Sequence, residues 1–272
     1  MVKNISRLIT LMLTLGFTST FSAQVMAVES TKPDQILEHI VQAYGGRTAL
    51  EGVKVVKHSG TMQSYRLGKT GALQRLFELP GKLLVDINYP DGPHEQRITT
   101  PAGAWRDGRP ATSPMHMAMK LQAARFQLPL LLTQHPVTVL EETADSVHLG
   151  LKLTDSTSLE VFVDRQSWRI VRSVGRMSMG GMNVAFTADY SDFRKVDGIL
   201  FAHREDLTAM GVRTGIAVLE RIEVNPQTHL DDFKPRVGDN GKGLVWRENN
   251  FVPVPRLIEK TAVKLGEVQT DP

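Results

Sequence analysis

Hydrophobic and polar residues alternate most regularly between residues 183 and 235. Alternation with a period of two predicts strands that have one apolar and one polar face. Asp197 and Gly198 form a pair that tolerates positive φ, so they predict a tight turn between two antiparallel strands. A third, long strand is predicted after Gly211. The apolar positions on these strands are Val184, Phe186, Ala188 and Tyr190, then Ile199 and Phe201, then Val212, Ile216, Val218, Ile222 and Val224.

Short extended runs of the same kind fill much of the preceding chain. Glycine, aspartate and proline separate them, most clearly at residues 90–92 and 107–108. Turn signals that recur about every ten residues predict a meandering antiparallel sheet. The predicted strands are residues 53–62, 72–79, 82–89, 95–100, 104–105, 147–153, 159–163 and 168–174.

Two segments have helical periodicity and are predicted to cover the sheet. The first begins at Pro33, with Thr31 as its predicted cap, and ends at Gly45 and Gly46. The second begins at Ser113, and a proline ends or kinks it before the leucines at residues 130–132. The apolar stripes are Ile36, Leu37, Ile40, Val41 and Tyr44 in the first helix and Met117, Leu121, Ala124 and Leu128 in the second.

Several short motifs in these segments form a pattern that resembles a known family. They are Tyr190-Ser191-Asp192-Phe193, Val196-Asp197-Gly198, Phe201, Ile222-Glu223-Val224-Asn225 and Phe233-Lys234-Pro235, together with residues 36–46 and Ala49-Leu50 near the other end. The pattern spans residues 36–235 and resembles the periplasmic lipoprotein carriers, the LolA/LolB-like proteins. The resemblance implies an α+β, mainly β fold, in which a curved antiparallel sheet or unclosed β-barrel has a helical lid.

The resemblance also implies an apolar cavity for acyl chains between the sheet and the lid. The candidate cavity residues are Met117, Leu121, Leu128, Leu130, Leu131, Phe186 and Phe201. The alternative is that these residues form an ordinary packed core. Met177, Met179 and Met182 flank two glycines and predict a mobile rim loop, because methionine is flexible and polarisable.

The start of the chain predicts secretion. Lys3 and Arg7 precede an apolar run at residues 8–17 that is too short to span a bilayer, so residues 1–27 are predicted to be a cleaved signal peptide. Cysteine is absent, so the sequence has no lipobox for an acyl anchor. We expect a periplasmic protein without a lipid anchor. Its predicted parts are a LolA-like domain at residues 28–235 and a C-terminal extension at residues 236–272, in which residues 255–265 are a candidate short helix.

Charge and aromatic content argue against a nucleic-acid partner. The formal net charge is +3, and removal of Lys3 and Arg7 with the signal peptide leaves it near zero. Trp105, Trp168 and Trp246 are dispersed, so they do not predict a base-stacking platform. The expected partners are a lipid or an acylated protein, with transient contact to membrane-bound proteins.

The motifs of common enzymes are absent from the sequence. There is no Gly-x-Ser-x-Gly, no cysteine nucleophile and no glycine-rich phosphate loop, so neither catalysis nor a cofactor is predicted. Glu141-Glu142 and Asp231-Asp232 are adjacent pairs that would point to opposite faces of a strand, so we expect them to be solvated.

Metal binding is the remaining chemical alternative. His203 and Glu205 share a strand face and would need a third ligand, and a surface histidine beside a salt-bridging glutamate is the favoured interpretation. Thioether and imidazole groups at Met115, His116 and Met119, with Met117 between them, suit Cu(I). Methionines at this spacing usually pack in a core, so no metal is predicted.

Three functions therefore follow from the sequence, in order of preference. The first is a non-catalytic carrier of a hydrophobic ligand, either a lipid or the acyl chains of a lipoprotein. The second is a regulatory sensor that binds a lipid or a protein partner on the same scaffold. The third is a Met/His copper protein or an enzyme.

Overall fold

The computed structural model describes residues 32–228 and 232–235, which lie in a compact unit that begins at Thr31. The predicted signal peptide at residues 1–27, the Thr31 cap and the extension at residues 236–272 lie outside the described residues. Within the described ranges, every helix is too short or too polar to cross a membrane.

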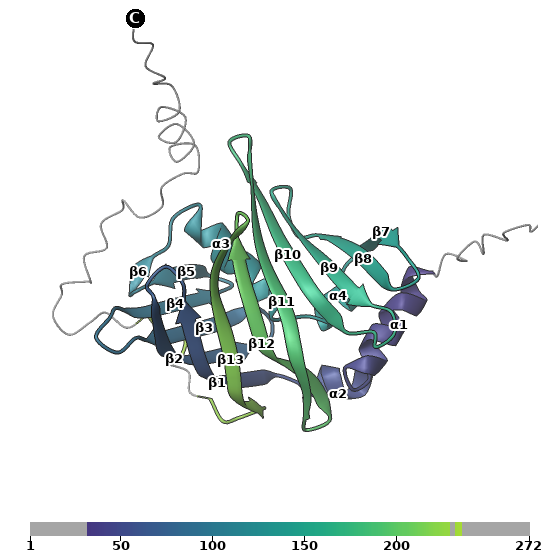
Figure 1. Ribbon diagram of the computed structural model, residues 1–272, viewed down its shortest axis with the longest axis horizontal. Coiled ribbons are helices and arrows are strands. Elements are labelled where there is room, and N and C mark those ends of the chain that lie inside the picture. Colours follow the sequence, from purple (N-terminus) through teal and green to yellow (C-terminus); the bar gives the residue numbers. More distant parts are fainter. Residues whose placement is uncertain (1–31, 229–231, 236–272) are drawn as a thin grey trace, which may run out of the picture. The chain divides into compact units, whose positions relative to one another are not determined.

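One antiparallel sheet of 13 strands makes up most of residues 32–228 (Figure 1). Its strands are β1 (Val55–Ser64), β2 (Lys69–Glu78), β3 (Lys82–Asn88), β4 (His94–Thr100), β5 (Gly103–Arg106), β6 (Arg109–Pro110), β7 (Val137–Glu142), β8 (Ser146–Lys152), β9 (Thr157–Asp164), β10 (Ile170–Met179), β11 (Met182–Val196), β12 (Ile199–Ala209) and β13 (Val212–Val224). The sheet is open, because β6 and β7 form its two edges. The predicted mainly β fold with an unclosed sheet is confirmed.

The sheet consists of two meanders that join through their first and last strands. Strands β1 to β6 and β7 to β13 each follow one another in chain order, and β1 pairs with β13. At this junction the register shifts between Ser59 and Gly60. A Cβ atom on Gly60 would lie 2.0 Å from the Val218 carbonyl oxygen, so this irregularity requires glycine.

In the described part of the chain, four helices accompany the sheet: α1 (Pro33–Ala43), α2 (Arg47–Gly52), α3 (Met115–Arg125) and α4 (Leu130–Gln134). The first is the predicted helix, with Lys32 at the cap position and Ile36, Ile40 and Val41 buried. Helices α3 and α4 are inserted between the two edge strands β6 and β7. Helix α3 contacts β9 and β10 of one meander and β4 and β5 of the other, and α1 contacts α4 and β7.

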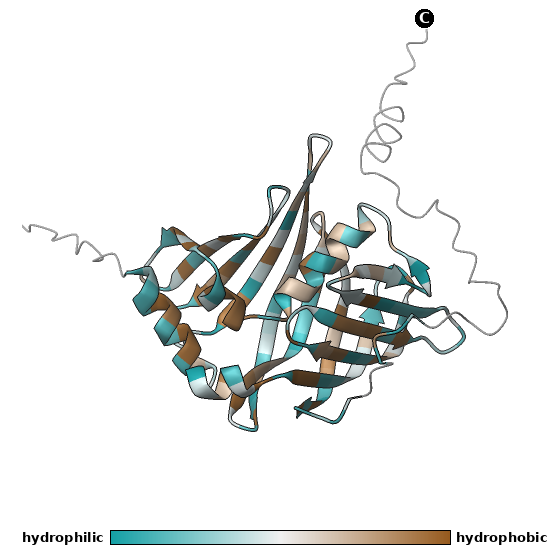
Figure 2. Cartoon of the chain, turned by 180° about the vertical axis from the view of Figure 1, so that it is seen from behind, coloured by the Kyte–Doolittle hydropathy of each residue, from teal (hydrophilic) through white to brown (hydrophobic). Residues whose placement is uncertain are grey.

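The main core lies between these helices and the inner face of the sheet. Figure 2 shows hydrophobic residues in bands along the strands and along α1. In α3 the buried residues are Met119, Leu121, Ala123 and Ala124, so the predicted stripe is correct for Leu121 and Ala124, whereas the predicted Met117 is only half-buried. The helix and β10 approach closely, because a Cβ atom on Gly175 would lie 2.5 Å from the Leu121 side chain.

The predicted methionine rim is part of a β-hairpin in the structure. Met177 and Met179 belong to the end of β10, Met182 begins β11, and Gly180 and Gly181 form the turn with positive φ. Met177 is buried and Met182 is half exposed. The strand ladder continues to the Met179–Met182 pair, so the segment is regular structure where a loop was predicted.

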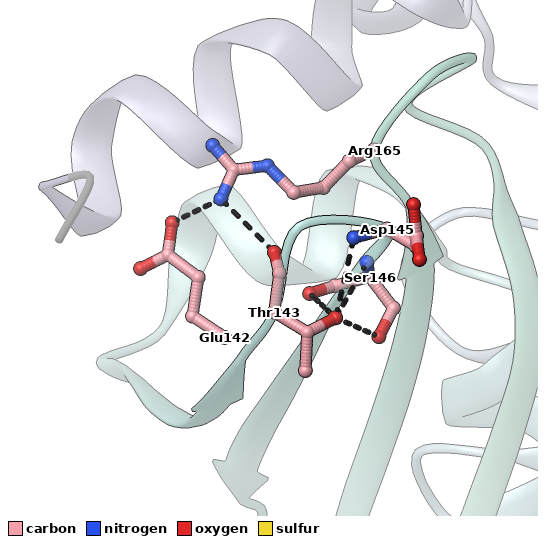
Figure 3. A network of polar contacts seen from close by, with 5 residues as sticks. All are labelled: Glu142, Thr143, Asp145, Ser146 and Arg165. Carbon is pink, nitrogen blue, oxygen red and sulfur yellow. Dashed lines mark hydrogen bonds and ion pairs between the residues drawn. The ribbon is translucent and has the colours of Figure 1, made fainter. Parts of the chain in front are cut away.

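Glu142 lies in a polar network at the turn between β7 and β8 (Figure 3). The Arg165 guanidinium is 2.5 Å from the Glu142 carboxylate and also donates to the Thr143 carbonyl oxygen. The Thr143 hydroxyl oxygen accepts from the backbone N–H groups of Asp145 and Ser146. Glu142 was predicted to be solvated, and the structure corrects this, since its side chain is 10% exposed and forms an ion pair.

Candidate functional site

A partly enclosed cavity of about 130 Å³ lies between the inner face of the sheet and the segment that follows α3. Most of its wall is apolar. The polar or charged residues that line it are Tyr44, His58, Arg125, Gln127, Tyr190 and Glu205. The apolar wall includes Leu50, Val53, Val56, Phe77, Phe126, Leu128, Leu130, Ile170, Phe193, Ile199, Leu200 and Phe201.

The structure brings three of the seven candidate cavity residues to this wall. Leu128 and Leu130 lie on either side of Pro129 in the covering segment, and Phe201 lies opposite on β12. The other four are not among the lining residues of this cavity. Leu121 and Leu131 are buried, and Met117 and Phe186 are half-buried on α3 and β11.

A buried ion cluster forms the polar end of the cavity. Arg75 Nη1 lies 2.7 Å from Glu205 Oε1, and Arg125 Nη2 lies 3.4 Å from Glu205 Oε2. The side chains of Arg75, Arg125 and Glu205 are 3%, 11% and 6% exposed, respectively, so all three charges are largely removed from water. The Glu205 carboxylate links β2, β12 and the end of α3.

Strand register explains why these groups meet on one face. His58 lies opposite Arg75 in the β1–β2 ladder, and Glu205 lies opposite Tyr190 in the β11–β12 ladder. Opposite residues of an antiparallel pair project to the same face. Because β1 and β12 both pair with β13, the two polar pairs lie on the same inner face, separated by one strand.

Two opposing effects act on Glu205. Burial raises the pKa of its carboxyl, but the positive charges of Arg75 and Arg125 and the hydrogen bond from Arg75 lower it, and the net pKa lies below its usual value. The carboxyl is therefore ionised at neutral pH and needs its arginine partners.

Phe126 connects the cluster to the apolar wall. Its ring lies 5.0 Å from the Arg75 guanidinium carbon and 5.4 Å from that of Arg125, both within cation–π distance. The rings of His58 and Phe77 are 6.0 and 6.2 Å from it. The residue directly after α3 thus holds the covering segment against the inner face of the sheet.

His58 is buried without a hydrogen-bond partner. Its residue is 7% exposed, and neither ring nitrogen has a partner in the part of the chain that the structure describes. Burial, with a contribution from Arg75, lowers the pKa of His58 to about 3, so the ring is neutral at pH 7. A neutral imidazole has one N–H donor and one acceptor nitrogen, and in His58 both are buried beside the cavity without a partner among the described residues.

Two buried tyrosines contribute hydroxyl groups to the same region. The Tyr190 hydroxyl lies 2.7 Å from the Ser173 hydroxyl, and burial raises the pKa of Tyr190 to about 12. The Tyr44 hydroxyl accepts a hydrogen bond of 3.1 Å from the Ile170 N–H, and burial raises the pKa of Tyr44 as well. Both phenols are therefore protonated at neutral pH.

The favoured interpretation, a surface histidine beside a salt-bridging glutamate, is wrong for His203, which is buried, and right for the ion pairing of Glu205. Both residues are 4% exposed, Glu205 is held by two arginines, and His203 Nδ1 donates to the Leu219 carbonyl oxygen at 2.7 Å. The sequence gives no direct signal for their partners, because Arg75 and Arg125 are 130 and 80 residues away from Glu205 along the chain. The one available indication is that Arg75 stands between Leu73 and Phe77 on an otherwise apolar strand face.

No trio of His, Asp or Glu side chains within residues 32–228 and 232–235 is grouped so that it could hold a metal ion. In the Met/His segment considered for copper, Met119 is buried in the core and the Met117 sulfur accepts a hydrogen bond from the Ser113 hydroxyl. These contacts are those of a packed helix.

Fold and cavity together define a class of protein: an open antiparallel sheet covered on its inner face by short helices, with an apolar cavity between the two layers. Among the solved structures that resemble it are three with a TM-score of 0.45 or 0.46. A domain from Vibrio parahaemolyticus described as an outer membrane lipoprotein-sorting protein is 14% identical, with 74% of this chain and 97% of that chain covered. A DUF1329 family protein from Desulfovibrio piger is 14% identical, with 75% and 98% covered. A LolA superfamily protein from Nitrosomonas europaea is 11% identical, with 73% and 96% covered.

The LolA-like resemblance in the sequence is thus found again among solved structures. No family model matches the chain, and no curated protein sequence matches it. Because the TM-scores are below 0.5, we infer the function from the cavity and not from these relatives.

Proposed function

We propose that this protein binds a hydrophobic ligand, a lipid or the acyl chains of a lipoprotein, in the cavity beneath residues 126–130, and carries it without chemical change. The observation that supports this is the partly enclosed, mainly apolar cavity of about 130 Å³. A well-packed core leaves few voids larger than a water molecule, so a space of this size with an apolar wall favours a binding role.

The size of the cavity implies that the covering segment moves when a long ligand enters. Cavities of about 150 Å³ in other proteins hold a molecule the size of benzene, so a long acyl chain needs more room. The segment from Phe126 to Leu130 is short and joins α3 to the start of α4. Three of its five residues are only half-buried. Burial of each methylene group contributes about 0.8 kcal/mol, so a long chain can offset the cost of displacing this segment.

Secretion belongs to the same proposal. The signal peptide predicted at residues 1–27 would deliver the protein to the periplasm, where a carrier shields acyl chains from water between membranes. A soluble carrier there would exchange its ligand through brief contacts with membrane-bound partners.

A fluorescence titration with an acyl-chain probe tests the proposal. Val56 lines the cavity, and Val55, its neighbour in β1, packs against Leu76 and Phe233 in a separate cluster. Val56→Phe should fill the cavity and weaken probe binding at least about tenfold, whereas Val55→Phe, a substitution of the same size at the adjacent position, should leave it nearly unchanged. Equal affinity of wild type and Val56→Phe, with both folded, would contradict the proposal.

A further inference from the structure

The polar end of the cavity carries more positive than negative charge. Two guanidinium groups, those of Arg75 and Arg125, face one carboxylate, that of Glu205. Other titratable groups near this cluster include His58, His203, Tyr190 and Arg97, and none of these four is a carboxylate. A buried cation that lacks a full partner is costly, so an anion at this place would be stabilised.

The surplus charge belongs to Arg125. Arg75 forms the shorter contact with Glu205, at 2.7 Å, whereas Arg125 reaches the second carboxylate oxygen at 3.4 Å. Arg125 is also the arginine that lines the cavity. Its guanidinium can therefore contact a ligand while the Arg75–Glu205 pair stays intact.

His58 supplies a second group for the same ligand. It lines the cavity and stands across the β1–β2 ladder from Arg75. Its ring nitrogens have no hydrogen-bond partner among the residues that the structure describes, although 93% of the residue is buried. An unsatisfied buried N–H costs free energy, and a ligand oxygen would satisfy it.

We infer that the ligand is an amphiphile with a single carboxylate head, of the long-chain fatty acid class, whose head lies between Arg125 and His58 and whose chain follows Phe201, Leu128 and Leu130. This inference rests on the proposed function and names the chemistry of its ligand. A carboxylate accepts hydrogen bonds from both the guanidinium and the imidazole, and such charge-assisted bonds are about twice as strong as neutral ones. The protonated Tyr190 hydroxyl lies on the same wall and is compatible with an anion.

The test compares hexadecanoic acid with hexadecanol, which has the same chain length and no charge, as competitors of the fluorescent acyl probe at pH 8. Wild-type protein should bind the acid about tenfold more tightly than the alcohol. Arg125→Met keeps most of the length of the side chain and leaves Arg75 paired with Glu205, so it should reduce the ratio to about one. Arg125→Lys keeps the charge and should preserve most of the preference.

Arg172→Met is the matched control, because Arg172 is exposed and pairs with Asp189, which lies on the opposite face of β11 from its neighbour Tyr190. It should keep the wild-type ratio. Equal binding of acid and alcohol by wild type would overturn the inference and leave the proposed carrier function standing. If the acyl probe does not bind to wild type, or if neither hexadecanoic acid nor hexadecanol displaces it, the proposed function itself is overturned. The wild-type comparison needs no variant, so a folding defect in Arg125→Met cannot hide the answer.

Discussion

Glu205 is the residue on which the buried charges depend. It is the carboxylate that both Arg75 and Arg125 contact, and all three side chains are nearly inaccessible to water. Removal of one member of a buried ion group leaves an uncompensated charge, which costs more than the pair contributes in net stability. Stability is therefore expected to be far more sensitive to Glu205 than to carboxylates in exposed pairs.

Glu205→Gln should lower the free energy of unfolding by about 3–5 kcal/mol, because two guanidinium groups remain buried without a counter-charge. Asp189→Asn, which removes the carboxylate of the exposed pair with Arg172, should cost less than about 1 kcal/mol. Urea unfolding at pH 7 measures both. Similar losses in the two variants would show that the cluster is not buried as described.

His58 makes the stability of the folded protein depend on pH below about 6.5. Its pKa falls from an ordinary 6.5 to about 3 in the folded protein because of burial. Below pH 6.5 the unfolded chain therefore binds a proton that the folded protein does not, and stability decreases as the pH falls toward 3. The pKa of Glu205 is also lowered in the folded protein. Glu205 therefore adds a further loss of stability that begins only at more acidic pH, near the ordinary carboxyl pKa of 4.5.

The free energy of unfolding of wild type should drop by roughly 2 kcal/mol between pH 7 and pH 5 through His58. In His58→Phe this part of the slope should vanish, whatever the variant's stability at pH 7. His135→Phe removes an exposed imidazole and controls for the loss of a histidine as such. Urea unfolding at a series of pH values measures the slopes, and an unchanged slope in His58→Phe would refute the buried, neutral imidazole.

At the scale of elements, the cover over the cavity depends on how α3 is anchored. Leu121 fits against Gly175 of β10, and a Cβ atom at that glycine would lie 2.5 Å from Leu121 Cδ2. At the other end of the helix, Arg125 and Phe126 contact the ion cluster. The covering segment at residues 126–130 is thus anchored at its start and leads directly into the short helix α4.

Gly175→Ala should destabilise the protein by about 1–3 kcal/mol, because the added methyl group overlaps with Leu121. Leu121→Ala removes the overlapping atoms, so Gly175→Ala should cost clearly less in that background. A double-mutant cycle measured by urea unfolding gives the coupling between the two positions. Additive effects would mean that α3 does not rest on Gly175.

The elements themselves were largely predictable. Residues 53–62, 72–79 and 82–89 were predicted as strands and correspond to β1, β2 and β3 with shifts at their ends. Period-two alternation identifies a strand locally, without knowledge of its neighbours. The predicted apolar stripe of α3 was less accurate, since Met119 is buried in place of Met117. The helix contacts both meanders of the sheet, and these contacts decide which of its faces is covered.

At the scale of the whole molecule, the site was only partly predictable, because it depends on contacts between residues that are far apart in the sequence. The sequence could indicate Leu128, Leu130 and Phe201 as cavity residues, because they are apolar positions in the predicted lid and in a predicted strand. The sequence could not predict the ion cluster of Arg75, Arg125 and Glu205, because that cluster depends on the register across several strands and on the position of α3. The same long-range packing buries His203, which was predicted to lie on the surface.

The central claim is that the cavity holds an acyl chain. Native mass spectrometry of the protein released gently from its own cells tests it most directly. The expected result is a wild-type mass increased by one lipid or fatty acid, with the increment absent from Val56→Phe and present in Val55→Phe. A ligand-free mass for wild type, unchanged after incubation with hexadecanoic acid or a phospholipid, would contradict the account.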